Sequence, residues 1–542
     1  MSDSHELWTE IEASVAKGIQ NQLVGHRQSK KNVMDVEEAF GQIEGRLSVL
    51  LKQQRNLFTP IGGLSDEIIL EILHYCLLPS HRYDLPRLQK PKLNAALSLC
   101  TRWRRIGVNA PSLWTTICLP SNLKLFRLYR ERSGTLPLSI YLSTQDLAVH
   151  GSVEAYLGDS LPQLFPRLAG LYIDWSIRGY GGLRSFLSTH IGHAELPCLI
   201  SLQVEFSGED YEGPDYMVNA PNLREYRFYG SLDHVHLTPF DNLLKFELEC
   251  FVMEPGEILY LLSLLPRVEH CDISNADPPA SIEDDHGLSV VTLNKLRSLS
   301  ISTLEVSDMA CLIRHIDLPS SATLSLRTGR NTSAAATSID DFVGSFLKLS
   351  EGLSISCNLS DRSRASETIY TLKSNARAKI DVTHYLYDKH ALKFMELESL
   401  CAHATSLTAL TLHSITLPSR NSLVRVLKVW TQLADIGVCT EQMQFEKLLT
   451  ALETPPGILC PKLRTLECSG TRFDSSRMKY FLQSRKDYGV PLQELKCTKG
   501  FAEPDVTGFV SLVPTLTEFE PNLSKCGFSH SWVRDCNCNL AP

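Results

Sequence analysis

The chain has 542 residues, more than one hydrophobic core usually supports, so we expect two or more units or one extended repeat array. Hydrophobic residues make up 43%, charged residues 21%, and the formal net charge is -8, which argues against a strongly basic nucleic-acid binder. The N-terminus is polar and acidic, unlike a secretory signal, and the longest apolar run, residues 258–265, is too short to span a bilayer. We therefore expect a protein of the cytoplasm, the nucleus or both, with neither membrane nor nucleic acid as a partner.

Residues 1–57 are predicted to be helical, with an apolar seam in their second half. The seam residues follow one another in steps of four and three, the heptad spacing of a helix that packs on another helix. They are Val36, Phe40, Ile43, Leu47, Leu50, Gln54 and Leu57. The seam indicates either a helix that folds back on its own protein or a coiled coil through which the chain self-associates.

A small helical unit is predicted over residues 58–119. Proline and glycine residues break the preceding helix, and a new helix over residues 64–73 begins with Ser65 or Asp66 as its N-cap. After a polar, proline-bearing connection, a second helical stretch is expected over residues 93–103.

One spacing keeps returning in the rest of the chain, residues 120–542: an apolar residue, two variable residues, an apolar residue, one variable residue and another apolar residue. Fourteen units between Leu168 and Leu516 have a mean period of roughly 27 residues, within the range of leucine-rich repeats. Clear units begin at Leu168, Leu199, Leu223, Leu243, Val268, Leu296, Leu407, Leu433, Leu463 and Leu492, weaker ones lie near Leu324, Leu353 and Ile380, and a frayed one begins at Leu516. Each unit predicts a short strand whose inward side chains stack on the strand of the next unit.

The segment from Leu64 to Trp114 resembles the F-box, a small three-helix module. Its opening Leu-Ser-Asp-Glu-Ile at residues 64–68 is similar to the Leu-Pro-x-Glu-Ile motif of that family, with Ser65 in place of the usual proline. Cys-Thr-Arg-Trp at residues 100–103 is similar to the Cys-x-x-Trp element of the family's last helix. The repeats that follow fit the combined F-box and leucine-rich-repeat architecture. The expected fold class is therefore α/β: an N-terminal helix and a three-helix F-box, followed by an irregular leucine-rich-repeat solenoid, or horseshoe.

What the resemblance implies is binding to the Skp-type adaptor of an SCF complex, which bridges to a cullin and a RING subunit. The docking residues carried over by position are Leu64, Ile68, Ile72, Leu73 and Trp103. A helical unit this small gains from burying apolar side chains on a partner, although the same side chains could form the unit's own core.

No catalytic motif is present: the sequence has no Gly-Lys-Ser/Thr phosphate loop, no Gly-x-Ser-x-Gly elbow and no His-Glu-x-x-His. Cys526, His530, Cys536 and Cys538 match no zinc template, and Arg102, Arg104 and Arg105 are interpreted as a solvated helix face. Other cysteines, such as Cys271, Cys468 and Cys497, occupy apolar repeat positions and are expected to be reduced core thiols. We expect no enzyme activity, no metal and no cofactor.

The variable strand positions are expected to line the concave face of the solenoid, where a target protein would bind. In the first five clear repeats they include six acids and two cations. The acids are Asp174, Glu205, Glu225, Glu247, Glu249 and Asp272, the cations are Arg227 and Lys245, and Tyr172 and Tyr229 add aromatic anchors. This part of the face either receives a basic segment of the target or is an ordinary solvated surface.

Together these patterns predict the substrate-recognition subunit of an SCF-type ubiquitin ligase. In this prediction the F-box binds the adaptor and the solenoid binds an unknown target protein. The alternative is a leucine-rich-repeat interaction scaffold that engages no ligase.

Overall fold

The chain divides into two compact units, Met1–Tyr141 and Leu142–Pro542, which are described separately. The structure is a computed structural model. It describes residues 9, 13–14, 16–18, 20–21, 24, 33–57, 59–76, 89–119, 123–143, 161–175, 183–206, 217–232, 235–238, 240–276, 288–328, 339–348, 350–359, 366–373, 379–386, 397–404, 406–454, 458–503 and 508–520. Within these ranges, no helix combines the length and the apolar composition that crossing a bilayer demands.

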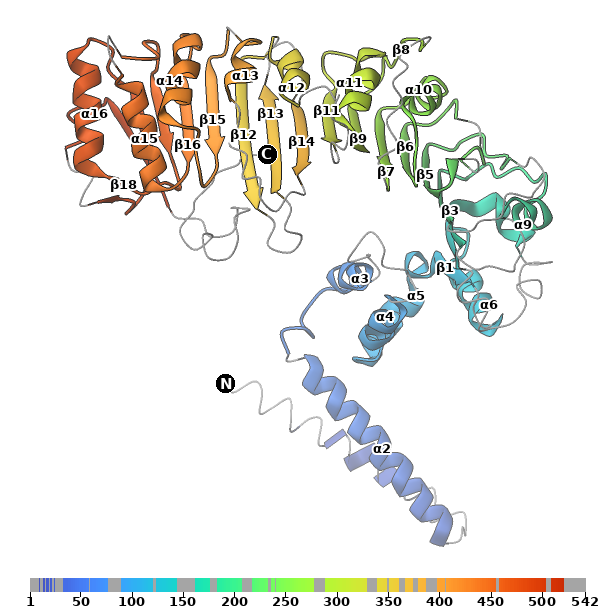
Figure 1. The fold of residues 1–542 in the computed structure, drawn as a ribbon. Coiled ribbons are helices and arrows are strands. Elements are labelled where there is room, and N and C mark those ends of the chain that lie inside the picture. The colour runs from blue at the N-terminus through green and yellow to red at the C-terminus, as the bar shows by residue number, and fades with distance from the viewer. Residues whose placement is uncertain are drawn as a thin grey trace. The chain divides into compact units, whose positions relative to one another are not determined.

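The first unit contains a long helix, α2 (Val33–Leu57), as the heptad seam predicts. Three shorter helices follow: α3 (Asp66–Tyr75), α4 (Gln89–Leu97) and α5 (Thr101–Asn109) (Figure 1). The expected single stretch over residues 93–103 is wrong. The backbone leaves the helical path at residues 98–100, where Cys100 takes an extended conformation (φ -159°, ψ 171°) and starts α5 as its N-cap.

The three short helices pack around a glycine. A Cβ atom on Gly107 would lie 2.2 Å from a terminal carbon of Leu97 and 3.3 Å from one of Leu73, so α5 approaches α3 and α4 more closely than a larger residue would allow. The Gly107 carbonyl also accepts a 2.9 Å hydrogen bond from the indole Nε1 of Trp114. The ring of Trp114 meets Tyr129 edge-on with 5.0 Å between centroids, which extends this core beyond the three helices.

The remaining elements of the first unit follow Trp114 in the chain. They are η2 (Pro111–Trp114), β1 (Thr116–Leu119), α6 (Leu123–Arg132) and β2 (Leu138–Ser143), whose last two residues lie past the division between the units. β1 pairs with β2.

The second unit is a solenoid built on one large sheet, drawn as a curved row of arrows in Figure 1. Every unit predicted from Leu168 to Leu516 contributes a strand, which confirms the repeat spacing. The strands are β3 (Leu168–Trp175), β4 (Ser201–Phe206), β5 (Glu225–Gly230), β6 (Lys245–Cys250), β7 (His270–Asn275), β9 (Ser298–Leu304), β11 (Thr323–Thr328), β12 (Gly352–Leu359), β14 (Ile380–Leu386), β15 (Ala409–His413), β16 (Asp435–Cys439), β17 (Thr465–Cys468), β19 (Glu494–Thr498) and β21 (Thr515–Phe519).

Parallel pairing stacks equivalent apolar residues of successive repeats. In the first six repeats one such row is Leu171, Leu202, Tyr226, Phe246, Cys271 and Leu299, all of them buried. The residues between the buried ones are half-buried or exposed, so the sheet has one core face and one open face. This alternation is the physical basis of the sequence repeat.

Helices lie between many of the strands in sequence, and several neighbours pack on each other. They are α9 (Leu183–His190), α10 (Pro255–Ser263), α11 (Val306–Arg314), α12 (Ile339–Leu347), α13 (Leu397–Cys401), α14 (Arg420–Val429), α15 (Gln442–Leu452) and α16 (Ser475–Asp487). Shorter elements complete the unit: η3 (Pro162–Arg167) and the parallel pairs β8 (Val291–Thr292) with β10 (Ile316–Asp317) and β18 (Phe473–Asp474) with β20 (Ala502–Glu503).

The expectation that each strand stacks on the next one in sequence is wrong in the middle of the solenoid. The neighbour of β11 is β14, and β12 lies two positions further along, beside β15. Between them runs β13 (Ser366–Lys373), which the repeat spacing did not reveal and which is antiparallel to both β12 and β14. After β11 the chain therefore forms β12 three positions along the sheet. It then runs back through β13 to β14, beside β11, and continues to β15 on the other side of β12.

Candidate functional site

Helix α3 carries an apolar stripe on its outer side. Ile68, Ile72 and Tyr75 follow one another in steps of four and three, which places them on one helix face. Ile68 is 45% exposed, Tyr75 is exposed and Ile72 is half-buried, whereas Ile69 and Leu73 on the other face are sealed in the core. The stripe offers apolar area that another protein could cover.

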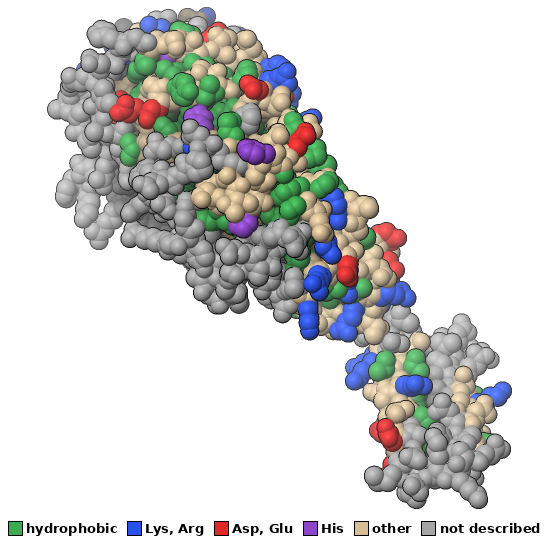
Figure 2. Space-filling model, turned by 90° about the vertical axis from the view of Figure 1, so that its right-hand side faces the viewer, with side chains coloured by type: hydrophobic (Ala, Val, Ile, Leu, Met, Phe, Trp, Pro, Cys, Tyr) green, Lys and Arg blue, Asp and Glu red, His purple; other side chains and the backbone are tan. Residues whose placement is uncertain are grey.

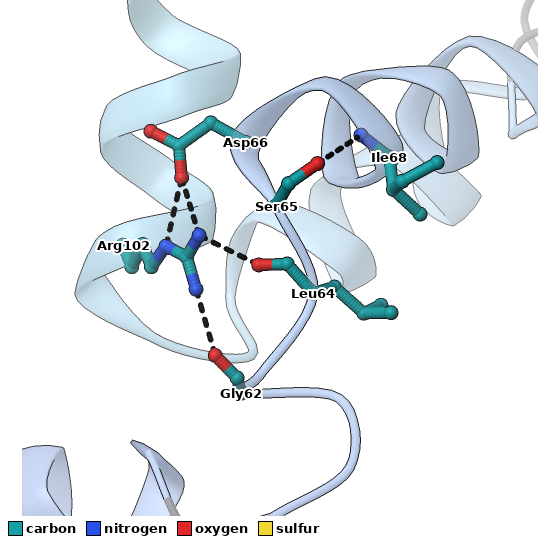
Figure 3. A network of polar contacts seen from close by, with 6 residues as sticks. All are labelled: Gly62, Leu64, Ser65, Asp66, Ile68 and Arg102. Atoms are coloured by element: carbon teal, nitrogen blue, oxygen red, sulfur yellow. Dashed lines mark hydrogen bonds and ion pairs between the residues drawn. The ribbon is translucent and has the colours of Figure 1, made fainter.

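The segment that leads into α3 is held by Arg102 of α5 (Figure 3). The guanidinium donates to the carbonyl oxygens of Gly62 and Leu64 at 2.7 Å each, and both its Nε and Nη2 atoms donate to Oδ1 of Asp66. The interpretation of Arg102 as a solvated helix face is therefore wrong. It is a clamp between the start of α3 and α5, whose fork of donors suits several oxygens at once.

The first turn of α3 is capped as the sequence predicts. Ser65 is the N-cap, and its hydroxyl accepts from the amide of Ile68 at 3.5 Å, at the long end of such bonds. Hydrogen bonds from its own backbone amide and from Ser65 lower the pKa of Glu67, which keeps a negative charge at the positive end of the helix dipole. These contacts stabilise the first turn of α3, which carries the side chain of Ile68.

The structure divides the five expected adaptor-binding residues into two groups. Leu64 and Ile72 are half-buried and Ile68 is exposed, so all three reach the surface. Leu73 and Trp103, however, are core residues, 0% and 5% exposed, and their expected docking role is wrong. Leu73 falls four residues after the buried Ile69 and so shares its inward face.

Tyr75 was missed in the sequence interpretation. The signal that would have found it is the step of seven residues from Ile68, which returns to the same helix face.

The second surface is the open face of β3 to β7, where the side chains expected to bind a target lie side by side. Three rows run across these strands. The first row is Ser201, Glu225, Lys245 and His270; the second is Tyr172, Gln203, Arg227, Glu247 and Asp272; and the third is Asp174, Glu205, Tyr229, Glu249 and Ser274. Adjacent members of a row are close enough to interact directly.

Charge is mixed over the side of the molecule drawn in Figure 2, where described acidic and basic side chains are interspersed. On the open face of β3 to β7 the two cations of the rows both bind one acid. Arg227 lies 3.1 Å and Lys245 2.9 Å from the carboxylate of Glu247, which is only 12% exposed. Glu247 is therefore a neutralised, structural member of the surface rather than a free charge.

The third row brings together the carboxyl groups of Asp174, Glu205 and Glu249. Burial raises the pKa of Glu205, the carboxylates of Asp174 and Glu249 raise it further, and a 3.0 Å hydrogen bond from Gln203 opposes them. Asp174 accepts a 2.9 Å hydrogen bond from the hydroxyl of Ser143. Such crowding of carboxylates favours a cationic ligand.

An aromatic pair lies beside the third row at its middle member, Tyr229. Tyr229 is half-buried and meets Phe251 edge-on with 6.3 Å between ring centroids, and Phe251, directly after β6, is exposed. Aromatic faces attract guanidinium and ammonium groups, so this pair extends the preference for cations.

The described residues give little indication of a metal site or of reactive cysteines. They contain no group of three or more His, Cys, Asp or Glu side chains that could hold a metal ion. Burial raises the pKa of the Cys460 thiol to about 12 and that of Cys497 to about 11, so both remain protonated. The C-terminal Cys526, His530, Cys536 and Cys538 lie outside the described residues.

Comparisons with known proteins add little to this picture. No family model matches the sequence, and a comparison with curated proteins finds no match. Among solved structures the chain is similar to an internalin of Listeria monocytogenes, with 13% sequence identity, coverage of 66% of this chain and 82% of that chain, and a TM-score of 0.24. The leucine-rich-repeat solenoid, a fold of protein-binding surfaces, follows instead from the register of the chain's own strands.

Proposed function

We propose that this chain is the substrate-recognition subunit of an SCF-type ubiquitin ligase, in which the helical unit binds a Skp-type adaptor and the solenoid binds the target protein. The observation that carries the proposal is the outer stripe of α3, with Ile68 at its centre, in a segment that resembles the F-box and precedes a repeat solenoid. Leu64, Ile68, Ile72 and Tyr75 are the side chains we assign to the adaptor contact.

The protein's contribution to ubiquitin transfer would be positional. The adaptor leads to the cullin and RING subunits, and the solenoid holds a target near the ubiquitin-charged enzyme, which raises the local concentration of the target's lysines. This role needs no catalytic residue and no cofactor in the chain, and it places the protein in the cytoplasm or the nucleus.

Binding to a purified Skp-type adaptor tests the first half of the proposal. The intact chain should retain the adaptor, and Ile68→Asp combined with Leu64→Asp should abolish retention, because two charges would be buried without partners. Leu136→Asp is the control: it places one aspartate, against two in the double variant, at an exposed leucine of this unit outside the three helices. Wild-type binding by the double variant would refute the assignment.

The target-binding half of the proposal assigns a basic peptide segment to the third row of the open face. Support comes from the carboxylates of Asp174, Glu205 and Glu249 and from the exposed ring of Phe251 beside Tyr229. A synthetic arginine- and glycine-containing peptide should bind the intact chain, with affinity that falls as salt is raised.

Charge reversal locates that binding. Glu205→Lys with Glu249→Lys should remove most of the peptide affinity, whereas Asp435→Lys, on the open side of the distant strand β16, should leave it unchanged. Equal losses in both variants would show general attraction to an acidic protein and would defeat the assignment. Peptide binding without adaptor binding would favour the alternative of a scaffold that engages no ligase.

A further inference from the structure

The carboxylates of the third row are set at a spacing that a bound peptide would have to match. Asp174 and Glu205 lie on the neighbouring strands β3 and β4, and Glu249 lies on β6, two strands beyond Glu205. Neighbouring strands are about 4.8 Å apart, so the backbones at Glu205 and Glu249 are separated by about 9.6 Å. One segment can pair with both acids only if it carries two cations at this distance on the same side.

An aromatic side chain lies between the two acids, with an apolar flank beside it. Tyr229 occupies the intervening strand, β5, and its ring meets that of Phe251 edge-on. Phe251 is 49% exposed and the next residue, Val252, is 48% exposed. On the opposite flank, in the second row, Arg227 is bound to Glu247. The row therefore offers acid, aromatic and acid in succession, with apolar side chains on one side.

Among the regular peptide conformations, the polyproline II helix fits this spacing. It has three residues per turn and rises about 3.1 Å per residue, so residues i and i+3 point the same way about 9.3 Å apart. Side chains on one side of an extended strand are about 6.7 or 13.4 Å apart, and both distances miss the required one. An α-helix offers about 10.5 Å between residues i and i+7, but its width of about 10–12 Å would bring a basic helix onto Arg227, two residues before Tyr229 on β5.

We propose that the third row binds a polyproline II segment of the target with arginines at positions i and i+3 and proline between them. This inference rests on the target-binding half of the proposed function and specifies the segment that it requires. The first arginine lies against Asp174 and Glu205, whose adjacent carboxylates suit the fork of donors in a guanidinium, and the second lies against Glu249.

Proline between the arginines serves both the conformation and the contact. Its ring fixes φ near the polyproline II value, which reduces the entropy lost when the segment binds. With three residues per turn, positions i+1 and i+2 point toward the two flanks of the row, so one proline ring can pack on Phe251 and Val252. Aromatic side chains are the usual partners of such segments.

Fluorescence anisotropy of labelled peptides with the full-length chain tests the spacing. Three peptides of one composition, Gly-Arg-Pro-Pro-Arg-Gly, Gly-Arg-Pro-Arg-Pro-Gly and Gly-Arg-Arg-Pro-Pro-Gly, differ only in the separation of their arginines. The first should bind about tenfold more tightly than the other two, because it alone reaches both acidic positions. A fourth peptide, Gly-Arg-Gly-Gly-Arg-Gly, should bind more weakly than the first, because its conformation is not fixed in advance.

Substitutions in the chain locate the preference. Glu249→Gln should remove it, since the second arginine loses its partner, and Phe251→Ala should weaken the first peptide more than the glycine peptide. Glu225→Gln is the matched control, because Glu225 is an exposed acid on the same open face but in the first row. It should leave the ranking of the four peptides unchanged.

The failure of this inference and the failure of the proposed function give different results. Equal affinities of the three proline peptides, with binding that Glu205→Gln and Glu249→Gln still weaken, would overturn the spacing but keep a basic segment on the third row. A preference that Glu225→Gln abolishes and Glu249→Gln leaves intact would also overturn the inference. If none of the four peptides binds, the target-binding half of the proposed function falls with it.

Discussion

Replacing Arg102 with methionine should loosen the start of α3 without emptying the core of the helical unit. Methionine keeps most of the aliphatic stem of arginine but removes every donor of the guanidinium. The carbonyls of Gly62 and Leu64 and the carboxylate of Asp66 would each lose a partner. The expected change is therefore local, in the segment that orients Leu64 and Ile68.

The magnitude follows from the exposure of each contact. The Arg102 and Asp66 side chains are 28% and 51% exposed, so their ion pair is worth about 0.5 kcal/mol. The two carbonyl bonds have a charged donor and are partly shielded, and each contributes about 1–1.5 kcal/mol. The total of about 2.5–3.5 kcal/mol would be a large fraction of the stability of a small unit.

Hydrogen exchange measured by mass spectrometry on the full chain is the suitable assay. The amide of Ile69 donates to the carbonyl of Ser65 at 3.1 Å and reports the opening of this turn. Peptides that cover residues 64–75 should exchange about a hundredfold faster in Arg102→Met. Asp66→Asn removes the ion pair alone and should accelerate exchange about threefold or less.

Two outcomes would contradict the reasoning. The first is exchange in Arg102→Met that stays within threefold of the wild type. The second is an Asp66→Asn variant as labile as Arg102→Met, because the ion pair rather than the carbonyl bonds would then hold the segment.

Two further predictions concern buried ionisable groups of the solenoid. Burial, with Glu305 and Glu254 nearby, raises the pKa of Asp308 to about 6, so its ionised form costs stability above that pH. Asp308→Asn should raise the free energy of unfolding by about 1–3 kcal/mol at pH 8 and lose this advantage as the pH falls toward 4. Urea titrations of the two proteins measure this difference in stability, and equal stabilities at pH 8 would contradict the prediction. Burial lowers the pKa of His384, whose ring lies 2.8 Å from the Thr328 hydroxyl, so stability should be full above about pH 6.5 and decline below it. Thermal unfolding of His384→Gln should lack this decline, and an unchanged pH profile would show that His384 does not cause it.

The strands of the solenoid could be predicted from the sequence because their burial alternates. A strand with one core face repeats its apolar residues at every second position, and leucine-rich units add a fixed offset to the next strand. Their order in the sheet could not be predicted in the same way. Ile355 and Val382 carry the same local pattern as the other units, and nothing local tells which strand each will pair with.

The candidate site was predictable in position but not in side-chain role. The motif at residues 64–68 marks the start of α3, and the periodicity of α3 separates Ile68 from Leu73 once the helix axis is known. The role of Arg102 depends on contacts with residues 36 to 40 positions earlier in the chain. The burial of Trp103 likewise depends on how α5 packs, which cannot be inferred from local sequence spacing.

The reversed meander divides the solenoid into two stacks that have no strand pair in common. β11 ends the first stack and β15 begins the second, and they are joined through β14, β13 and β12. Each repeat is stabilised by its immediate neighbours, so the antiparallel strand β13 stabilises the junction between the two stacks. Its side chains Tyr370 and Leu372 are buried. The acidic rows of β3 to β7 lie entirely within the first stack, so the surface assigned to the target can be formed by repeats that pair without β15 to β21.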